Sequence, residues 1–201
     1  MTTATDLMIV TMDVRSARPA EPGDLSLALA GAEAIDLIGA EVLTLRGDHL
    51  LPGLQPALGD GLLDEAASSL VRQEPYESIE DWLWRRGRGL SRAYLAALEK
   101  DGGITTRRRG WNPLRTTEPA LVDSPARSHA ADRWHAGDPV LAALAAAVGI
   151  TDQPAADSLD AVSDPVVTVL AAVNDAVMEL EAVRQRQAVE NAAFDNVWRG
   201  E

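Results

Sequence analysis

The chain has 201 residues, no cysteine and a formal net charge of −13, and 46% of its residues are hydrophobic. This length and apolar fraction suit one globular domain with a sizeable core, and the lack of cysteine excludes disulfides, thiolate metal sites and cysteine nucleophiles. The longest uncharged apolar run, 139–151, is shorter than the roughly 20 residues that a membrane span needs. No basic secretory signal precedes residue 6. We therefore expect a cytoplasmic protein whose membrane contact, if any, is peripheral.

The basic residues are concentrated in one segment. Residues 85–133 contain 11 of the 18 Lys and Arg residues but 5 of the 31 Asp and Glu residues, a net of +6 against −19 for the remainder. A basic segment in an acidic protein is typical of a place that meets an anion, because the field of the whole molecule would otherwise repel it. The sequence therefore predicts an anion-binding surface within 85–133.

In the N-terminal part of the chain, the pattern predicts helices separated by loops. Residues 6–12 form a short apolar element, either helix or strand. Asp24 is expected to cap a long helix over 25–45, because an Asp oxygen accepts hydrogen bonds from first-turn N–H groups. Proline and glycine predict an extended segment at 49–57, and the apolar spacing of 62–72 predicts an amphipathic helix.

Two helices are expected in the basic segment. Ser78 is expected to cap the first, with Asp81 at the third helical position, a weak form of the capping box. Gly87 and Gly89 interrupt the helical pattern, and a second helix follows over 90–100. Its inward residues are Leu90, Tyr94 and Leu98.

A β-hairpin is expected next, with strands at 104–107 and 111–115 and its turn near Gly110. Helices are expected over 124–135 and 138–148, the second with Asp138 as N-cap and proline in the first turn.

A last helix begins near Asp164, which is again followed by proline. Its apolar stripe stops at the polar run 184–187, where we expect the helix to break.

Signatures of catalysis are absent. The sequence contains no G-x-S-x-G turn, P-loop, G-x-G-x-x-G or H-E-x-x-H motif. His129, Asp132 and His135 are spaced over about 120° of a helix, which favours a surface helix over a metal site. We therefore expect neither an enzyme nor a bound metal or other cofactor.

The helix at 90–100 and the following hairpin have the outline of a winged helix, with Arg107, Arg108 and Arg109 at the wing. Arginines beside Trp111 can follow phosphates and stack on a base. The net charge of −13 argues against nucleic acid as the favoured partner, since nucleic-acid binders are usually basic.

A set of short motifs resembles the Golgi phosphoprotein 3 family. The motifs are LAGA at 29–32, LTLRG at 43–47, LLDE at 62–65, DWL at 81–83, LEKDGGITT at 98–106 and PL at 113–114. Their order and spacing carry the resemblance, which covers residues 5–180. It implies a mainly α-helical single domain with a small β-hairpin that binds phosphatidylinositol 4-phosphate as a peripheral membrane adaptor. The short length is similar to that of the bacterial relatives.

The resemblance also implies where the lipid headgroup binds. Eukaryotic members use a Trp and an Arg near the first long helix, and an R-x-x-R pair before the helix that ends in the Gly-Ile-Thr turn. That pair falls on Arg88 and Ser91, with Arg92 adjacent. Ala30 stands where the first-helix Arg is expected, and no Trp precedes Trp82. The implied headgroup site is therefore Arg88, Ser91 and Arg92.

The spacing of the arginines supports an anion site without the resemblance. If the helix begins at Arg88, then Arg88 and Arg92 lie one turn apart on one face, away from Leu90 and Tyr94. Two guanidinium groups on one face can hold a phosphate. The hairpin is expected to contact the membrane through Arg107, Arg108, Arg109 and Trp111.

The sequence thus predicts a single domain over 1–201 that binds phosphatidylinositol 4-phosphate or another anionic phospholipid headgroup at the cytoplasmic membrane face. A protein partner and a homo-oligomer are compatible with such an adaptor. Two alternatives stay open: a winged-helix-like nucleic-acid binder and an oligomeric protein-interaction scaffold. We expect retention by anionic but not neutral liposomes, and no tight binding to duplex DNA at physiological salt.

Overall fold

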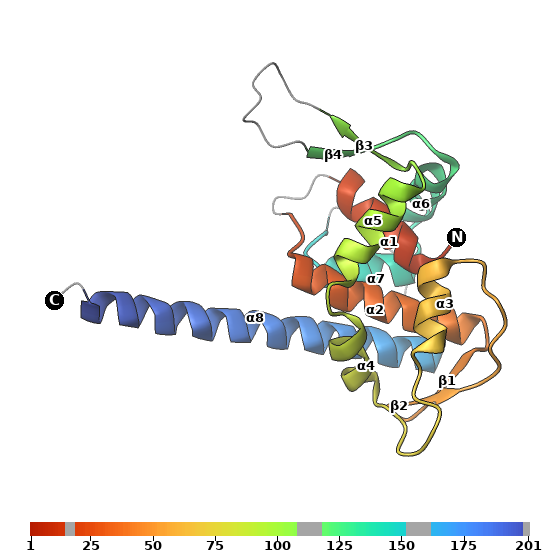
Figure 1. Ribbon diagram of the computed structural model, residues 1–201, viewed down its shortest axis with the longest axis horizontal. Helices are drawn as coiled ribbons and strands as arrows, with labels where there is room; N and C mark the ends of the chain where they lie inside the picture. The colour runs from red at the N-terminus through yellow and green to blue at the C-terminus, as the bar shows by residue number, and fades with distance from the viewer. Residues whose placement is uncertain (15–18, 108–117, 152–161, 199–201) are drawn as a thin grey trace.

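The computed structural model describes residues 1–14, 19–107, 118–151 and 162–198, with the side chains of 106, 107, 118 and 192–198 left out. These residues form eight helices and two antiparallel β-hairpins (Figure 1). The elements are α1 Thr3–Asp13, α2 Pro22–Gly39, β1 Leu43–Arg46, β2 His49–Pro52, α3 Gly61–Ser68, α4 Ile79–Arg86, α5 Leu90–Lys100, β3 Ile104–Arg107, β4 Glu118–Leu121, α6 Pro125–His135, α7 Pro139–Ala147 and α8 Asp164–Trp198. The predicted mainly α-helical class is confirmed.

Helix α2 lies at the centre of the molecule, where α1, α3, α4, α5, α7 and α8 pack around it. Such a helix is apolar on every side, and α2 is buried almost continuously from Leu25 to Ile35. Its small residues let neighbouring backbones approach closely. A methyl group on Gly31 would collide with the Cγ2 atom of Val173 in α8. One hydrophobic core therefore includes residues from α1 through α8.

The boundaries of α2 differ from the predicted helix over 25–45. The helix begins earlier, with Glu21 as N-cap and proline in the first turn, so the prediction of Asp24 as the cap was wrong. It ends at Gly39 because Glu41 takes a left-handed conformation with a φ of 57°, and the Val42 N–H donates to the Leu37 carbonyl at 3.0 Å. This is a left-handed C-terminal cap carried by Glu rather than by the usual Gly.

The chain after this cap forms a β-hairpin instead of further helix. Strand β1 pairs with β2 in a register that joins Leu43 to Pro52 and Arg46 to His49. Gly47, at the turn, has a φ of 63°, a conformation that glycine adopts without steric cost. Residues 43–45, predicted as helix, are therefore strand.

Helices α4 and α5 confirm the predicted Ser78 cap and the predicted break between them. The Ser78 hydroxyl accepts a hydrogen bond from the Asp81 N–H at 3.0 Å. Helix α4 ends at Arg86, and α5 begins at Leu90 after Gly89, whose φ is 72°. The predicted inward residues of α5 are all buried, namely Leu90, Tyr94 and Leu98.

The second hairpin has the predicted first strand, β3, which pairs with β4 at 118–121. The predicted second strand, 111–115, lies outside the described residues. The register places Ile104 opposite Leu121, and the Val122 N–H donates to the Gly103 carbonyl at 2.9 Å. The apolar Ile104–Leu121 pair, which packs on the core, selects this register.

Helix α7 confirms Asp138 as the expected N-cap, which accepts a hydrogen bond from the Leu141 N–H at 2.9 Å. In α6 the Ser124 hydroxyl caps the helix in the same way and accepts from the Arg127 N–H at 3.2 Å. Among the described helices, none is both long enough and apolar enough to cross a bilayer.

Helix α8 runs without interruption over 35 residues, so the predicted break at 184–187 was wrong. No Gly or Pro follows Pro165 within it. Its first half packs on α2, α4 and α7, whereas its second half extends beyond the rest of the molecule (Figure 1). Within the polar run, Gln185 donates to Glu181 at 3.0 Å, and Arg184 binds Asp24 of α2 at 2.8 Å. These contacts hold the helix where its apolar stripe ends.

Candidate functional site

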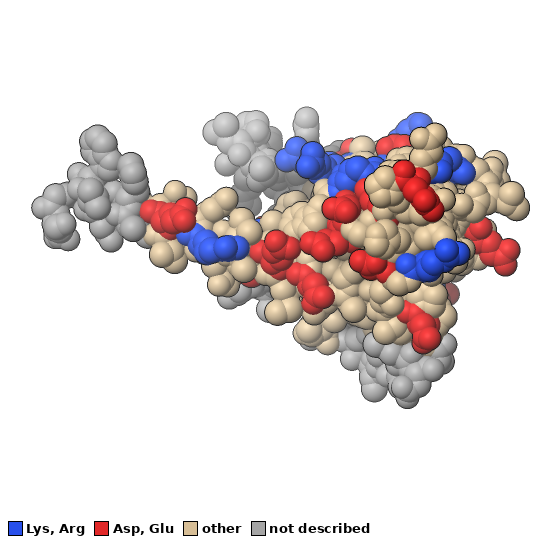
Figure 2. Space-filling view, turned by 90° about the horizontal axis from the view of Figure 1, so that it is seen from below, with Lys and Arg blue, Asp and Glu red and all other residues tan. Residues whose placement is uncertain are grey.

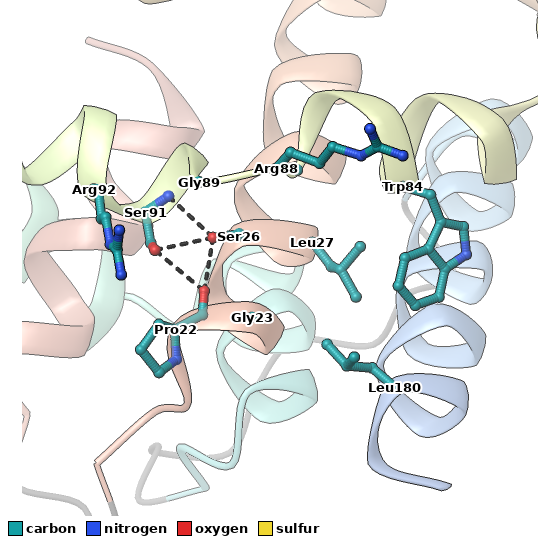
Figure 3. Close-up of a pocket in the computed structure, with 11 residues that line it drawn as sticks. Pro22, Gly23, Ser26, Leu27, Trp84, Arg88, Gly89, Ser91, Arg92 and Leu180 are labelled. Atoms are coloured by element: carbon teal, nitrogen blue, oxygen red, sulfur yellow. Dashed lines mark hydrogen bonds between the residues drawn. The ribbon is translucent and has the colours of Figure 1, made fainter. Parts of the chain in front are cut away.

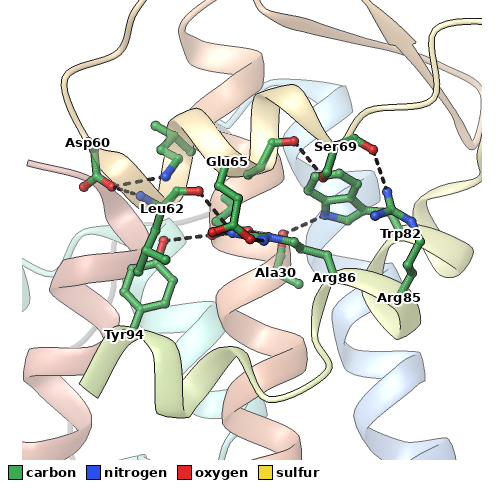
Figure 4. A network of polar contacts seen from close by, with 12 residues as sticks. Ala30, Asp60, Leu62, Glu65, Ser69, Trp82, Arg85, Arg86 and Tyr94 are labelled. Carbon is green, nitrogen blue, oxygen red and sulfur yellow. Dashed lines mark hydrogen bonds and ion pairs between the residues drawn. The ribbon is translucent and has the colours of Figure 1, made fainter. Parts of the chain in front are cut away.

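Two arginines of the basic segment are paired with carboxylates of the fold, Arg86 through a largely buried side chain and Arg85 through an exposed one. Arg86 in α4 binds the carboxylate of Glu33 through Nε at 2.7 Å and Nη2 at 3.0 Å (Figure 4). Arg85 binds Glu77 at 2.6 Å, and its guanidinium lies 5.2 Å from the ring centre of Trp82. Neither arginine is therefore free to bind an external anion.

The Glu33 carboxylate is fully buried and also accepts a hydrogen bond from the Tyr94 hydroxyl at 3.1 Å. Burial raises the pKa of Glu33, and the hydrogen bonds and charge of Arg86 act in the opposite direction. Burial, together with the charge of Glu33, raises the pKa of Tyr94 as well. This network joins α2, α4 and α5, which, together with α8, border the candidate site.

Two further arginines of the segment, both in α6, are also paired. Arg127 binds Asp13 at 2.6 Å and Asp123 at 2.7 Å. Arg133 binds the fully buried Asp6 at 2.7 Å and Asp138 at 2.8 Å. The segment is therefore less available to anions than its net charge indicates. Figure 2 shows acidic and basic side chains interspersed on one face, rather than a continuous basic field.

Arg88 and Arg92 differ from these four arginines. Both side chains are exposed, and neither forms an ion pair with any other residue that the structure describes. Arg88 lies in the link between α4 and α5, and Arg92 lies in the first turn of α5. Helix α5 begins at Leu90, as predicted, so Arg88 lies outside it and the two arginines do not lie one turn apart on one helical face.

The two arginines border one cavity of about 390 Å³ between the start of α2, the α4–α5 link and α8. In Figure 3 the Arg88 side chain extends toward Trp84, whereas Arg92 lies on the side of Ser91 and Pro22. The guanidinium groups therefore flank the cavity instead of converging on one point. All three predicted headgroup residues, Arg88, Ser91 and Arg92, line this cavity.

Ser91 is buried, and its hydroxyl is engaged at the base of the cavity. It donates to the Pro22 carbonyl at 3.1 Å, and the Ser26 hydroxyl donates to the same carbonyl at 2.6 Å. The Ser91 N–H donates to the Ser26 hydroxyl oxygen at 3.1 Å. These bonds tie the start of α5 to the start of α2 and thereby fix the base of the cavity.

The α4–α5 link lies directly on α2, which positions Arg88. An added methyl group at Gly87 would lie 3.3 Å from the Ser26 carbonyl oxygen and 2.6 Å from that of Leu83. Glycine is thus needed for this close approach. The paired glycines on either side of Arg88 are the sequence signal of a tight link, and the structure places that link at the cavity.

The sequence did not predict the apolar wall of the site. Trp84 of α4 and Leu180 of α8 line the cavity, where they form this wall with Leu27 of α2 (Figure 3). The helical spacing of Leu180 identified it as a core residue. Trp84 lies in a basic run, and the sequence does not indicate which way its side chain points. The wall joins three elements that are distant in sequence.

The predicted membrane-contact hairpin is described only in part. The backbone of Arg107 ends β3, and its side chain is not described. Arg108, Arg109 and Trp111 lie outside the described residues. His129 and His135 bond to Asp6 and to the Ala131 carbonyl, respectively. No group of three or more potential metal ligands occurs in the parts of the chain that the structure describes.

The chain matches one known protein family over most of its length. The family model of Golgi phosphoprotein 3 (GPP34) matches residues 4–191, which is nearly the whole chain and includes every element that borders the cavity. A search of curated proteins found no match. The match over 4–191 confirms the resemblance carried by the ordered motifs, and the chain belongs to the Golgi phosphoprotein 3 family.

Proposed function

We propose that this protein binds anionic phospholipid headgroups at the cytoplasmic face of a membrane, as a peripheral adaptor without enzymatic activity. The observation that carries the proposal is the contrast among the arginines. Four arginines of the basic segment form ion pairs with carboxylates of the fold, whereas Arg88 and Arg92 form none with the described residues and lie exposed beside one cavity. Exposed guanidinium groups bind phosphate through charge-assisted hydrogen bonds.

Family membership supports the same function and adds a finer proposal. Phosphatidylinositol 4-phosphate is the headgroup that the resemblance implies, with contacts from Arg88, Arg92 and the position of Ser91. In this chain the Ser91 hydroxyl already donates to the Pro22 carbonyl, so we assign it a positioning role. The arginines then supply the charge, at about 1 kcal/mol for each basic residue near an anionic membrane.

The test is flotation of the full chain with liposomes of matched surface charge that differ in headgroup. We expect retention on phosphatidylserine, phosphatidylglycerol and phosphatidylinositol 4-phosphate liposomes, none on phosphatidylcholine, and a loss of binding as salt rises. The Arg88→Ala/Arg92→Ala variant is expected to bind roughly thirtyfold more weakly, from about 1 kcal/mol per arginine.

The matched control is Arg46→Ala/Arg72→Ala, which removes two exposed charges that do not line the cavity. An equal loss of liposome binding in both variants would show that Arg88 and Arg92 act only as part of a general charged surface. Equal retention on neutral liposomes would contradict the proposal. A sub-micromolar shift of random duplex DNA at physiological salt would instead favour the nucleic-acid alternative.

A further inference from the structure

The cavity beside Arg88 has two chemically different halves. On one side lie Ser26, Ser91 and the Pro22 carbonyl, and on the other lie Leu27, Trp84 and Leu180 (Figure 3). Leu27 is buried, and Trp84 and Leu180 pack against the core while remaining partly exposed. The apolar half is thus fixed in place by the fold and open to the cavity.

The donor groups of the polar half are already hydrogen-bonded within the protein. Both serine hydroxyl groups donate to the Pro22 carbonyl, and the Ser91 N–H is taken by Ser26. A sugar or polyol in the cavity would therefore compete with bonds that already hold α2 to α5. The groups left for an anion are the guanidiniums of Arg88 and Arg92 at the rim.

From this arrangement we infer that the site recognises an anionic amphiphile, with its phosphate at the arginines and an apolar chain against Trp84, Leu27 and Leu180. The inference rests on the proposed function and specifies its ligand class. A volume of about 390 Å³ lies within the usual range for small-molecule pockets. Each methylene that leaves water tightens binding about fourfold. A phosphate without a chain leaves the apolar wall in contact with water.

Trp84 is the specificity-determining residue in this arrangement. Trp84 lies on α4 and lines the cavity. Arg88 follows four positions later, and its side chain extends toward Trp84 (Figure 3). A chain lying on the indole therefore places its phosphate near Arg88. Leu180 completes the wall from α8, so the ligand contacts the helix that projects from the molecule.

Titration calorimetry of the full chain tests the inference with three soluble probes below their micellar concentrations. They are inorganic phosphate, octyl phosphate and the uncharged octyl glucoside. We expect octyl phosphate to bind at least about tenfold more tightly than inorganic phosphate, and octyl glucoside to bind more weakly than octyl phosphate. Trp84→Ala is expected to remove most of the affinity advantage of octyl phosphate over inorganic phosphate, and Trp84→Phe is expected to retain part of that advantage. The control Leu54→Ala, at an exposed residue that does not line the cavity, is expected to retain all of it.

Leu180→Ala provides a second variant of the apolar wall. Like Trp84→Ala, it is expected to reduce the affinity advantage of octyl phosphate over inorganic phosphate. Equal affinities for octyl phosphate and inorganic phosphate, or an unchanged advantage in both wall variants, would overturn the inference. If liposome binding still depended on Arg88 and Arg92 in that case, the proposed function would stand. If liposome binding ignored those arginines, the proposed function would fail independently.

Discussion

Arg86 and Glu33 form a buried two-point ion pair that joins α4 to α2, with the Glu33 side chain fully removed from solvent. This pair explains why a positive charge in the basic segment does not act at the surface. A buried charge requires a partner, because desolvation without one costs several kcal/mol. Arg86 is that partner, and it also donates to the Leu62 carbonyl at 3.0 Å.

The first prediction concerns this pair. Arg86→Ala is expected to lower the free energy of unfolding by about 3–5 kcal/mol, since it leaves the buried Glu33 carboxylate without a charged partner. Glu33→Ala is expected to cost less, because Arg86 keeps its ion pair with Glu65 at 2.7 Å. The double variant Glu33→Leu/Arg86→Met is expected to lose less than the sum of the two single losses. Urea denaturation measures all of these values, and strictly additive losses would show that the two residues act independently.

The second prediction concerns alkaline pH. Burial, with the charge of Glu33, raises the pKa of Tyr94 above its ordinary value of about 10. Above that pH the unfolded chain loses the phenol proton while the folded chain retains it. Stability is therefore present below pH 10 and decreases above it, by about 1.4 kcal/mol per pH unit for this one group.

The variant Tyr94→Phe has no phenol to ionise. The difference in unfolding free energy between the wild type and Tyr94→Phe is therefore expected to shrink above pH 10. Tyr76→Phe, at a partly exposed tyrosine, is the matched control. Chemical denaturation at a series of pH values gives the slopes, and parallel pH profiles for wild type and Tyr94→Phe would contradict the prediction.

The third prediction concerns the packing of α2 against α8. Gly31→Ala improves helix propensity by up to about 1 kcal/mol, but its methyl group meets Val173 Cγ2. Overpacking of a core typically costs about 1–3 kcal/mol, so we expect a net loss of stability. Thermal denaturation of the Gly31→Ala/Val173→Ala double variant should show a smaller loss than the two single variants added together. A stabilised Gly31→Ala variant would mean that α8 moves aside freely.

The fourth prediction separates the positioning role of Ser91 from a headgroup contact. Ser91→Ala removes the bond to the Pro22 carbonyl and is expected to lower the unfolding free energy by about 1 kcal/mol. Liposome binding by the folded variant is expected to remain near wild type. The exposed Ser128 in α6 gives the control Ser128→Ala. Weakened liposome binding at unchanged stability would instead identify Ser91 as a headgroup ligand.

Local chemistry in the sequence predicted much of the fold. Ser78 and Asp138 were identified as N-caps because a cap is decided by a side chain and the N–H groups two or three positions later. The break at Gly87 and Gly89 and the inward face of α5 were predicted for the same reason, since spacing along one helix needs no tertiary information. The ordered motifs predicted the family, which the match over 4–191 confirms.

The errors arose where distant contacts outweigh local preference. The end of α2 is set by Glu41 in a left-handed conformation, which a sequence rule based on Gly does not detect. The partner of β3 is selected by the Ile104–Leu121 contact on the core. The continuity of α8 past residue 184 depends in part on the bond from Arg184 to Asp24, which is 160 positions away.

The sequence by itself determined the helical class, most helix starts and the location of the positive charge. Only the tertiary structure decided which arginines can meet a ligand, because that depends on whether a carboxylate such as Glu33 or Asp6 lies within bonding distance. It also decided the chemistry of the cavity, since Trp84 and Leu180 approach each other only when α4 and α8 both pack against α2. The charge of an arginine can be read from the sequence, whereas its ability to bind an external ligand depends on which residues lie next to it in the fold.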